Sequence, residues 1–469
     1  MTLDHWSSAV DMAAAVRARE VSARELLELH LARIEQVNPS VNALVSLDPD
    51  RARAAAASAD EQLASGAPVG PLHGLPFAVK DTHAVAGWRT TYGSPLFADH
   101  VPDRDELLVE RVRAAGAVIV GKSNTPEFAA GSHTFNTVFG TTLNPFDLSR
   151  SAGGSSGGAA AALASGMVPL ADGSDMGGSL RNPASFCNVV GLRPSLGRVP
   201  SWPADNAWET LSVGGPLART VGDVALLLSV LAGPDRRVPL ALGDPGRTFA
   251  PPLAGSLAGL RVALSTDLGG AFAVEPEVAA VVESAGAVLA AEGATVVPAY
   301  PSLPEAEDTF RTLRAWLFQA VFGPLLAEHP SAFKQSLADN IRAGEPLTGA
   351  DVARGYRQRT ALTQRMVEFF DDHDVLVLPV SQVPPFPADQ EFPTTVAGRP
   401  METYLDWMRS AYFVTVTGCP AISVPAGFTD EGLPVGIQVV APHNQERRLL
   451  EVAWVFEQAT RVGDRRPPL

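Results

Sequence analysis

Hydrophobic residues near the start of the chain recur at helical spacing. One apolar face, from Leu26 to Ile34, follows the pair Ser22 and Glu25, whose spacing is that of a capping box and predicts the start of a helix. A second, Ala-rich helix is predicted over residues 51–65. After these helices the pattern changes to short apolar runs without polar alternation, which predict buried strands.

The first two such runs, 77–80 (FAVK) and 117–120 (AVIV), lie on either side of an amphipathic helix predicted over residues 105–115. The same alternation returns further along the chain. Strands are predicted at 260–264, 375–378 and 435–440, and helices at 275–292, 349–371 and 446–460. Helices that alternate with strands are typical of an α/β layered fold around a central, largely buried sheet.

The composition of the chain limits the cellular compartment and the kinds of partner that we expect for the protein. The 469 residues include 36 basic and 51 acidic ones, and the net charge of -15 repels phosphate backbones and anionic lipid. Cys187 and Cys419 are the two cysteines, and the N-terminal sequence has no signal-peptide pattern. The uncharged stretch 151–171 is too rich in Gly, Ser and Pro for a membrane span. We therefore expect a cytoplasmic protein that binds neither nucleic acid nor membrane.

Two familiar motifs are rejected because of their context. Residues 116–123 (GAVIVGKS) match the phosphate-loop pattern, but their middle residues form the predicted strand and cannot cradle phosphate. Residues 153–157 (GGSSG) match the nucleophile elbow of α/β-hydrolases, but a polar, turn-forming stretch precedes them in place of a strand. No HExxH, CxxC or clustered histidine pattern occurs, so we expect no metal and no cofactor.

Three segments combine a lysine, serines and glycines in a way that packing does not require. Residues 74–81 (GLPFAVKD) place Lys80 at the end of a predicted buried strand, where lost hydration lowers the pKa of an amine and produces a base. Residues 151–158 (SAGGSSGG) and 172–181 (DGSDMGGSLR) carry serines among glycines. A serine hydroxyl needs such a base to act as a nucleophile, and glycines let backbone N–H groups approach a developing oxyanion.

These segments resemble the amidase signature family. The likeness covers the run from 153 to 200 and extends to residues 74–81, 127–147, 215–223 and 418–442. The resemblance implies a single large α/β/α layered domain over 1–469, with a central mixed twisted sheet and a helical cap insertion. The implied parts are N-terminal helices (1–70), a catalytic core (71–235), a helical cap (about 236–370) and the C-terminal part of the core (371–469).

The resemblance also implies roles for individual residues. Lys80 matches the family's catalytic lysine, Ser155 matches the bridging serine that follows a cis peptide bond, and Ser179 matches the acylated nucleophile. The expected oxyanion donors are the backbone amides of Met176, Gly177, Gly178 and Ser179. The expected structural residues are Ser156, Asp175 and Arg181, and those expected at the substrate are Ala129, Gly131, Ser132 and Ser155.

Two departures from the family pattern are visible. Ser174 and Ser195 stand where the family usually has threonine, and neither is expected to touch the catalytic triad. Further candidates for the pocket wall, equally suited to the core, are Trp208, Trp316, Phe318 and Tyr404.

The predicted activity is hydrolysis of C–N bonds in neutral amides and anilides, extending to esters and carbamates (urethanes), through an acyl-enzyme. Because no segment offers a clear cluster of charge, the small-molecule substrate is expected to be neutral and partly aromatic. Two alternatives stay open: the glutaminase subunit of a tRNA-dependent amidotransferase, and a non-catalytic binding protein on the amidase fold. We expect a monomer or a homodimer.

Overall fold

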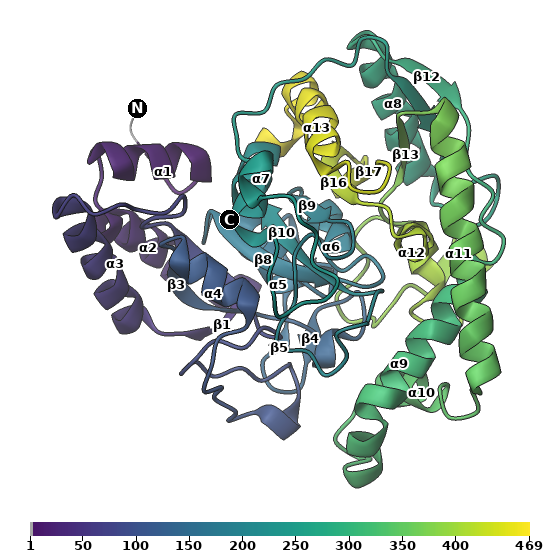
Figure 1. Cartoon of the computed structure of the whole chain (residues 1–469), viewed down its shortest axis with the longest axis horizontal. Helices are drawn as coiled ribbons and strands as arrows, with labels where there is room; N and C mark the ends of the chain where they lie inside the picture. The colour runs from purple at the N-terminus through teal and green to yellow at the C-terminus, as the bar shows by residue number, and fades with distance from the viewer. Residues whose placement is uncertain (1–2) are drawn as a thin grey trace.

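An eleven-stranded mixed sheet crosses the centre of the molecule (Figure 1). The computed structural model describes residues 3–469. In order across the sheet, the strands are β1 (Leu44–Leu47), β3 (Val118–Ser123), β2 (Pro76–Lys80), β8 (Leu170–Asp175), β10 (Val213–Ala218), β9 (Val190–Arg193), β16 (Ala421–Phe428), β17 (Pro434–Val440), β13 (Val375–Pro379), β11 (Arg261–Leu264) and β12 (Thr295–Pro298). Three two-stranded ribbons are formed by β4 (Phe135–Asn136) with β5 (Gly140–Thr141), β6 (Leu143–Asn144) with β7 (Asp147–Ser151), and β14 (Thr395–Val396) with β15 (Arg399–Pro400).

Helices flank this sheet along its whole width (Figure 1). They are α1 (Ala9–Ala18), α2 (Ala23–Val41), α3 (Pro49–Ala64), α4 (Leu107–Ala114), α5 (Gly157–Ala164), α6 (Arg181–Phe186), α7 (Val221–Leu231), α8 (Pro276–Ala291), α9 (Ala306–Glu328), α10 (Gln335–Arg342), α11 (Gly349–Asp372), α12 (Arg409–Thr417) and α13 (Glu446–Thr460). Short 3₁₀ turns occur at Pro95–Phe97, Glu127–Ala129, Gly246–Phe249, Asp406–Met408 and Val462–Asp464. The predicted capping box of Ser22 and Glu25 starts α2, as expected.

The sheet buries apolar side chains on both of its faces. Along β2, Phe77 and Val79 belong to the hydrophobic cluster that includes α7, whereas Ala78 between them belongs to the cluster that includes α5. Successive side chains of a strand point to opposite faces, so these two helices lie on opposite sides of the sheet. The layered α/β fold predicted from the sequence is therefore confirmed.

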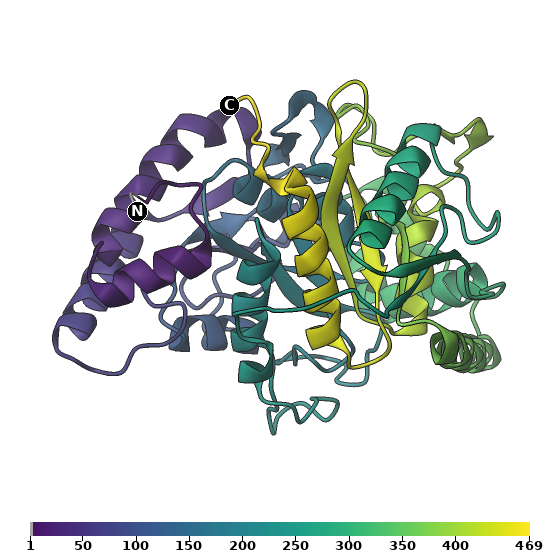
Figure 2. The same ribbon diagram turned by 90° about the horizontal axis from the view of Figure 1, so that it is seen from above.

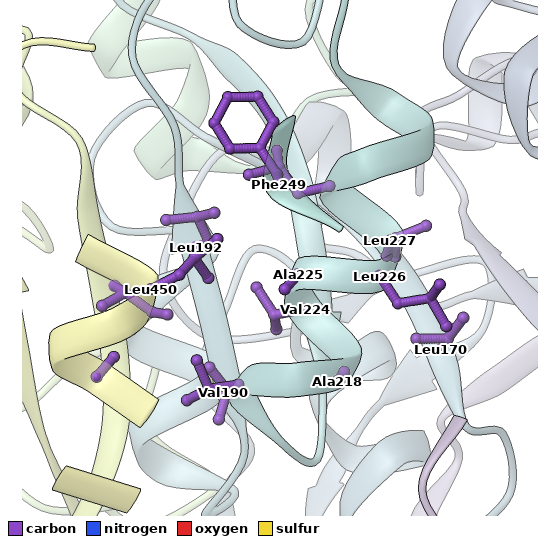
Figure 3. Close-up of a cluster of buried hydrophobic side chains, with 14 of the residues drawn as sticks. Leu170, Val190, Leu192, Ala218, Val224, Ala225, Leu226, Leu227, Phe249 and Leu450 are labelled. Carbon is purple, nitrogen blue, oxygen red and sulfur yellow. The ribbon is translucent and has the colours of Figure 1, made fainter. Parts of the chain in front are cut away.

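Figure 3 shows how α7 is held against the sheet. Its residues Val224 and Leu227 belong to the same buried cluster as Leu170 of β8, Val190 of β9 and Leu450 of α13. Burying a side chain of this kind contributes roughly 1.5–3 kcal/mol. The packing fixes β8, whose carboxyl end leads into the serine- and glycine-rich segment after residue 175.

Two parallel strands bring the lysine and that segment together. β2 pairs in parallel with β8, with Phe77 opposite Leu170 and Ala78 opposite Ala171. The carboxyl ends of adjacent parallel strands lie at the same edge of a sheet. Lys80, at the end of β2, and Asp175, at the end of β8, are therefore brought to one edge.

The segment from 236 to 370 is less uniformly helical than the cap that the resemblance implied, and the strand predicted at 260–264 is present as β11. β11 and β12, joined by α8, extend the central sheet in parallel with β13. This part of the segment joins the sheet because residues 262–264 are apolar and are largely buried when they pair between β12 and β13, whereas a solvent-exposed cap would leave them in water. Helices α9, α10 and α11 lie together at the side of the molecule away from α1 and α3 (Figure 1). The domain boundaries themselves stay a prediction.

Between residues 3 and 469 there is no helix with both the length and the apolar character that a bilayer crossing requires.

Candidate active site

Lys80 lies buried among three serine hydroxyls. Its Nζ is 2.7 Å from Ser155 Oγ, 3.0 Å from Ser156 Oγ and 3.0 Å from Ser174 Oγ. The backbone N–H of Lys80 donates to Asp172 Oδ1 at 3.0 Å, which fixes the end of β2 against β8. The contact with Ser174 corrects the expectation that this position lies away from the lysine, since its side chain at the end of β8 faces the amine.

Burial changes the protonation of Lys80. Because the ammonium form loses its hydration, burial lowers the pKa of Lys80 from 10.5 to about 7, against the raising effect of Asp172 and Asp175. An amine with this pKa is substantially neutral at physiological pH. The ammonium form of Lys80 can donate a hydrogen bond to each of the three hydroxyl oxygens, whereas the neutral amine can donate to two of them and accept from the third.

Ser155 sits at the entrance to α5, in a backbone fixed by buried contacts. The Gly154–Ser155 peptide bond is cis, as the family resemblance implied. The Gly154 carbonyl accepts a hydrogen bond from Ser132 Oγ at 2.8 Å, and Ser132 Oγ accepts one from Asn182 Nδ2 at 2.9 Å. Ser132 therefore holds the backbone before Ser155. It is buried and is not among the residues that line the cavity, so the expectation that it borders the substrate is not met.

The loop that carries Ser179 is anchored on Asp175. The Asp175 carboxylate accepts hydrogen bonds from Arg181 Nε (3.0 Å) and Nη2 (2.9 Å), and Arg193 lies beside it. Burial would raise the pKa of Asp175, but the two guanidinium groups hold it well below its usual range. This arrangement agrees with the expectation that Asp175 and Arg181 are structural residues. Ser156 supports the same loop, because its N–H donates to the Ser179 carbonyl at 3.2 Å.

One of the four expected oxyanion donors is already occupied. The Gly178 N–H donates to Asp175 Oδ1 at 3.0 Å, and the Leu180 N–H donates to Oδ2 at 3.1 Å. The carboxylate that orders the loop therefore uses the Gly178 amide. Among the contacts of the described chain, the amides of Met176, Gly177 and Ser179 have no such partner. These three remain available at the cavity.

A cavity of about 410 Å³ opens beside these groups, and both Ser155 and Ser179 line it. In the described part of the chain no hydrogen bond joins their two hydroxyls. Catalytic hydrogen bonds are often long in unliganded enzymes and shorten when substrate binds. Ser179 is 8% exposed and so can be reached from the cavity.

The cavity wall is mainly apolar and aromatic. Its apolar side chains include Phe128, Met176, Phe310, Phe318, Phe322, Met408 and Tyr404. The expected residues Ala129 and Gly131 line it as well, while the candidates Trp208 and Trp316 do not. The sequence could not tell which of these aromatic residues line the cavity, because that depends on which side chains surround each of them in the folded protein.

The cap helices fix the 127–131 loop on one side of the cavity. Lys334, at the start of α10, donates from Nζ to the Ala130 carbonyl at 2.6 Å and from its backbone N–H to Glu127 Oε2 at 2.9 Å. Phe128 and Ala129 have left-handed backbone (φ 48° and 56°), which non-glycine residues rarely adopt. The two hydrogen bonds from Lys334 thus hold this strained loop in place at the cavity wall.

A buried contact between His83 and Asp172, which also binds the Lys80 backbone, was missed by sequence reasoning. His83 Nδ1 contacts Asp172 Oδ2, and His83 and Glu106 both line the cavity. Burial would lower the pKa of His83, but the carboxylates of Asp172 and Glu106 raise it above its ordinary value. The only sequence signal was the position of His83 three residues after Lys80. Among residues 3–469 no group of three or more His, Cys, Asp or Glu side chains is arranged to hold a metal ion.

Comparison with known proteins identifies the family. The family model described as Amidase matches residues 25–450. The chain belongs to the amidase family. An acylamidase of Rhodococcus erythropolis is 38% identical to this amidase over 467 residues, covering 99% of this chain and 97% of that protein. One subunit of the glutamyl-tRNA(Gln) amidotransferase of Synechococcus sp. (strain CC9605) is 37% identical over 494 residues, covering 100% and 98%.

The solved structures agree. A bacterial aryl acylamidase of the amidase signature family superposes on this amidase with a TM-score of 0.92 and 31% sequence identity, covering 98% of both chains. The resemblance drawn from the sequence is thus confirmed. This amidase is a hydrolase that cleaves amide bonds.

Proposed function

We propose that this amidase hydrolyses neutral amide and anilide bonds through an acyl-enzyme on Ser179, with Lys80 as the base acting through Ser155. The observation that carries the proposal is the 2.7 Å contact between the buried Lys80 amine and Ser155 Oγ, at the edge of a cavity that Ser179 also lines. A base with a pKa of about 7 is matched to proton transfer at neutral pH.

The proposed acylation begins with two coupled proton transfers and breaks one C–N bond. Neutral Lys80 takes the Ser155 proton while Ser155 Oγ takes the proton of Ser179, and Ser179 Oγ bonds to the carbonyl carbon. The carbonyl electron pair moves to oxygen, where the amides of Met176, Gly177 and Ser179 can donate to it. Collapse expels the amine, which receives the proton through Ser155. Water, deprotonated by the same route, then hydrolyses the ester and regenerates Ser179.

The aromatic cavity wall supports substrates with an apolar acyl or aryl part. Amides, esters and carbamates can all acylate a serine through the same steps, so the proposal extends to esters and urethanes. A panel of 4-nitroanilide, 4-nitrophenyl ester and 4-nitrophenyl carbamate substrates tests it by release of the chromophore. We expect turnover of anilides and esters. Activity confined to free glutamine would refute the proposal.

A second candidate function is that of the glutaminase component of a tRNA-dependent amidotransferase. It is favoured by the full-length match to the Synechococcus amidotransferase protein, at nearly the same identity as the acylamidase match. Glutaminase activity that tRNA stimulates, together with co-purification of other subunits, would support it. The expectation of a non-catalytic binding protein is set aside, because the family model and the acylamidase relatives identify an amide-cleaving hydrolase.

The carboxylate of Asp172 is expected to set the pH at which this amidase loses activity. Its charge raises the pKa of Lys80, and the proposed mechanism needs Lys80 neutral, so activity falls as pH drops through that pKa. Asp172→Asn removes the charge and keeps the shape. The pKa of Lys80 then falls, and the acidic limb of the kcat/KM profile moves to lower pH.

The profile is measured on a 4-nitroanilide between pH 5 and 9. The matched control is Asp103→Asn, which removes an exposed carboxylate and should leave the limb in place. An acidic limb that stays unmoved in Asp172→Asn, or that moves to higher pH, contradicts the role given to Asp172.

A further inference from the structure

Arg314 is a buried cation on the cavity wall. It lies in the middle of α9, is 5% exposed, and lines the same cavity as Ser155 and Ser179. The guanidinium is charged at every physiological pH and carries five N–H donors. A buried charge of this kind is normally neutralised by a carboxylate.

Arg314 has no carboxylate within ion-pair distance in the described part of the chain. Its neighbours on the same side of the molecule do: Arg311 and Arg409 both pair with Glu307 and Asp406. Arg314 instead donates from Nη1 to Asn340 Oδ1 and from Nη2 to Tyr404 Oη, both neutral acceptors.

Aromatic rings complete the surroundings of this guanidinium. Its Cζ lies 3.9 Å from the centre of the Phe318 ring and 5.4 Å from that of Tyr404. Ring faces attract a cation but leave its N–H donors unsatisfied. The two recorded hydrogen bonds use two of the five donors, and the Tyr404 hydroxyl, which accepts from Arg314, keeps its own proton to donate. One fixed positive charge and several donors therefore remain for a ligand in the cavity.

The position of Arg314 relates it to the reacting atoms. A Cβ atom at Gly177 would lie 3.1 Å from Phe310 and 3.2 Å from Met408, so these two side chains adjoin the proposed oxyanion loop. Arg314 follows Phe310 by four residues on the same face of α9, which is about 6 Å along the helix axis. Arg314 and the proposed oxyanion loop therefore line the same cavity, with Arg314 about one turn of α9 beyond the residue that adjoins the loop.

We infer that Arg314 and Tyr404 form a subsite for a carboxylate carried by the amide substrate, a few bonds from the scissile bond. The inference rests on the proposed function and narrows its substrate class: the cleaved bond is an uncharged amide, and the remote end of the molecule is an anion. A planar carboxylate matches the fork of a guanidinium, and a charge-assisted hydrogen bond of this kind is worth about 10–100-fold in binding.

The acidic side chains on the cavity wall do not neutralise Arg314. Glu106, Asp205 and Glu209 also line the cavity, but none forms an ion pair with Arg314. Glu106 accepts from the Ala84 N–H, and Glu209 accepts from the backbone of the residues that follow it. None of these carboxylates therefore neutralises Arg314, and the guanidinium keeps its charge for a ligand in the cavity.

Matched substrates test the inference. Glutaryl-4-nitroanilide carries a carboxylate at the far end of its acyl chain, 4-(pentanoylamino)benzoate carries one on its amine side, and pentanoyl-4-nitroanilide carries neither. In the wild type we expect kcat/KM for at least one carboxylate substrate to exceed that for its uncharged counterpart by about 10–100-fold. The arm that shows the preference tells whether the subsite serves the acyl or the amine part.

Arg314→Met should remove this preference, so the carboxylate-to-neutral ratio falls toward one. Tyr404→Phe keeps the cation and should reduce the ratio by a smaller factor. The matched control is Arg311→Met on the same helix, whose side chain pairs with Glu307 and Asp406 and does not line the cavity; its ratio should stay within about twofold of wild type.

Binding to the Ser179→Ala protein, measured by calorimetry, separates this inference from the proposed function. A wild type that turns over none of the three anilides refutes the proposed function, while tighter binding of glutaryl-4-nitroanilide than of pentanoyl-4-nitroanilide still supports the subsite. The inference is overturned if the charged and uncharged compounds have equal kcat/KM in the wild type and equal affinity for Ser179→Ala. It is also overturned if Arg314→Met keeps the preference for the carboxylate compound.

Discussion

Ser179→Ala is expected to reduce kcat for anilide hydrolysis by at least about 10⁴-fold, because removing the nucleophile of a serine hydrolase leaves only binding and oxyanion stabilisation. The fold should be unaffected. Ser179 lies at the cavity, and the hydrogen bond that ties its loop to the start of α5 uses its backbone carbonyl and not its hydroxyl. Release of 4-nitroaniline from a 4-nitroanilide measures kcat for both proteins.

Two controls accompany this variant. Its melting temperature should match that of the wild type within about two degrees, and a fluorophosphonate should label the wild type but not the variant. Retention of most of the activity by folded Ser179→Ala would exclude Ser179 as the nucleophile.

The second large effect is expected for Lys80→Met, which removes the proposed base and keeps an apolar side chain of similar length. We expect kcat to fall by about 10³–10⁵-fold, in the range typical of losing a general base together with its positioned proton relay. The wild-type profile should rise with pH through about 7, where Lys80 becomes neutral. The residual rate of the variant should lack this step and rise only at high pH, as hydroxide replaces the base.

The same substitution should change the pH dependence of stability. The pKa of Lys80 is about 7 in the folded protein, against 10.5 for an ordinary lysine. Between these values the unfolded chain binds the proton and the folded chain does not, so the contribution of Lys80 to the free energy of unfolding rises with pH from about 7 to 10.5. Urea unfolding of both proteins at pH 7 and 9.5 measures it. An equal pH dependence in Lys80→Met would contradict a neutral, buried Lys80.

The groups that the sequence located are those whose neighbours along the chain define them. Lys80 ends an apolar run, which placed it at the end of a buried strand, and Ser155 and Ser179 lie among glycines, which placed them in Gly-rich segments beside it. The partners that come from distant segments were not visible. Asp172 contacts Lys80 and His83 across about 90 positions of the chain, and nothing local in either segment signals the other.

Hydrogen-bond competition accounts for the expectations that failed. A glycine next to Ser179 looks like a free donor in sequence, yet the Gly178 amide is used by Asp175. Ser132 looks like a pocket residue, yet its hydroxyl is used by the Gly154 carbonyl. Arg314 looks like an ordinary helix residue, because its lack of a carboxylate partner is a property of the folded neighbourhood and not of α9.

The place of β16 and β17 in the sheet has a consequence for biosynthesis. These strands, from the last fifty residues, lie in the middle of the sheet and join β9 on one side to β13 on the other (Figure 2). Until residue 440 has left the ribosome, the strands on the two sides of β16 and β17 cannot be joined, so β9 and, once it is synthesised, β13 each present an open strand edge. Exposed edges of this kind promote association between chains. From the completion of β10 at residue 218 until residue 440, polysomes that translate this protein therefore carry chains with an unpaired strand edge, and we expect its yield to depend on chaperones that bind nascent chains.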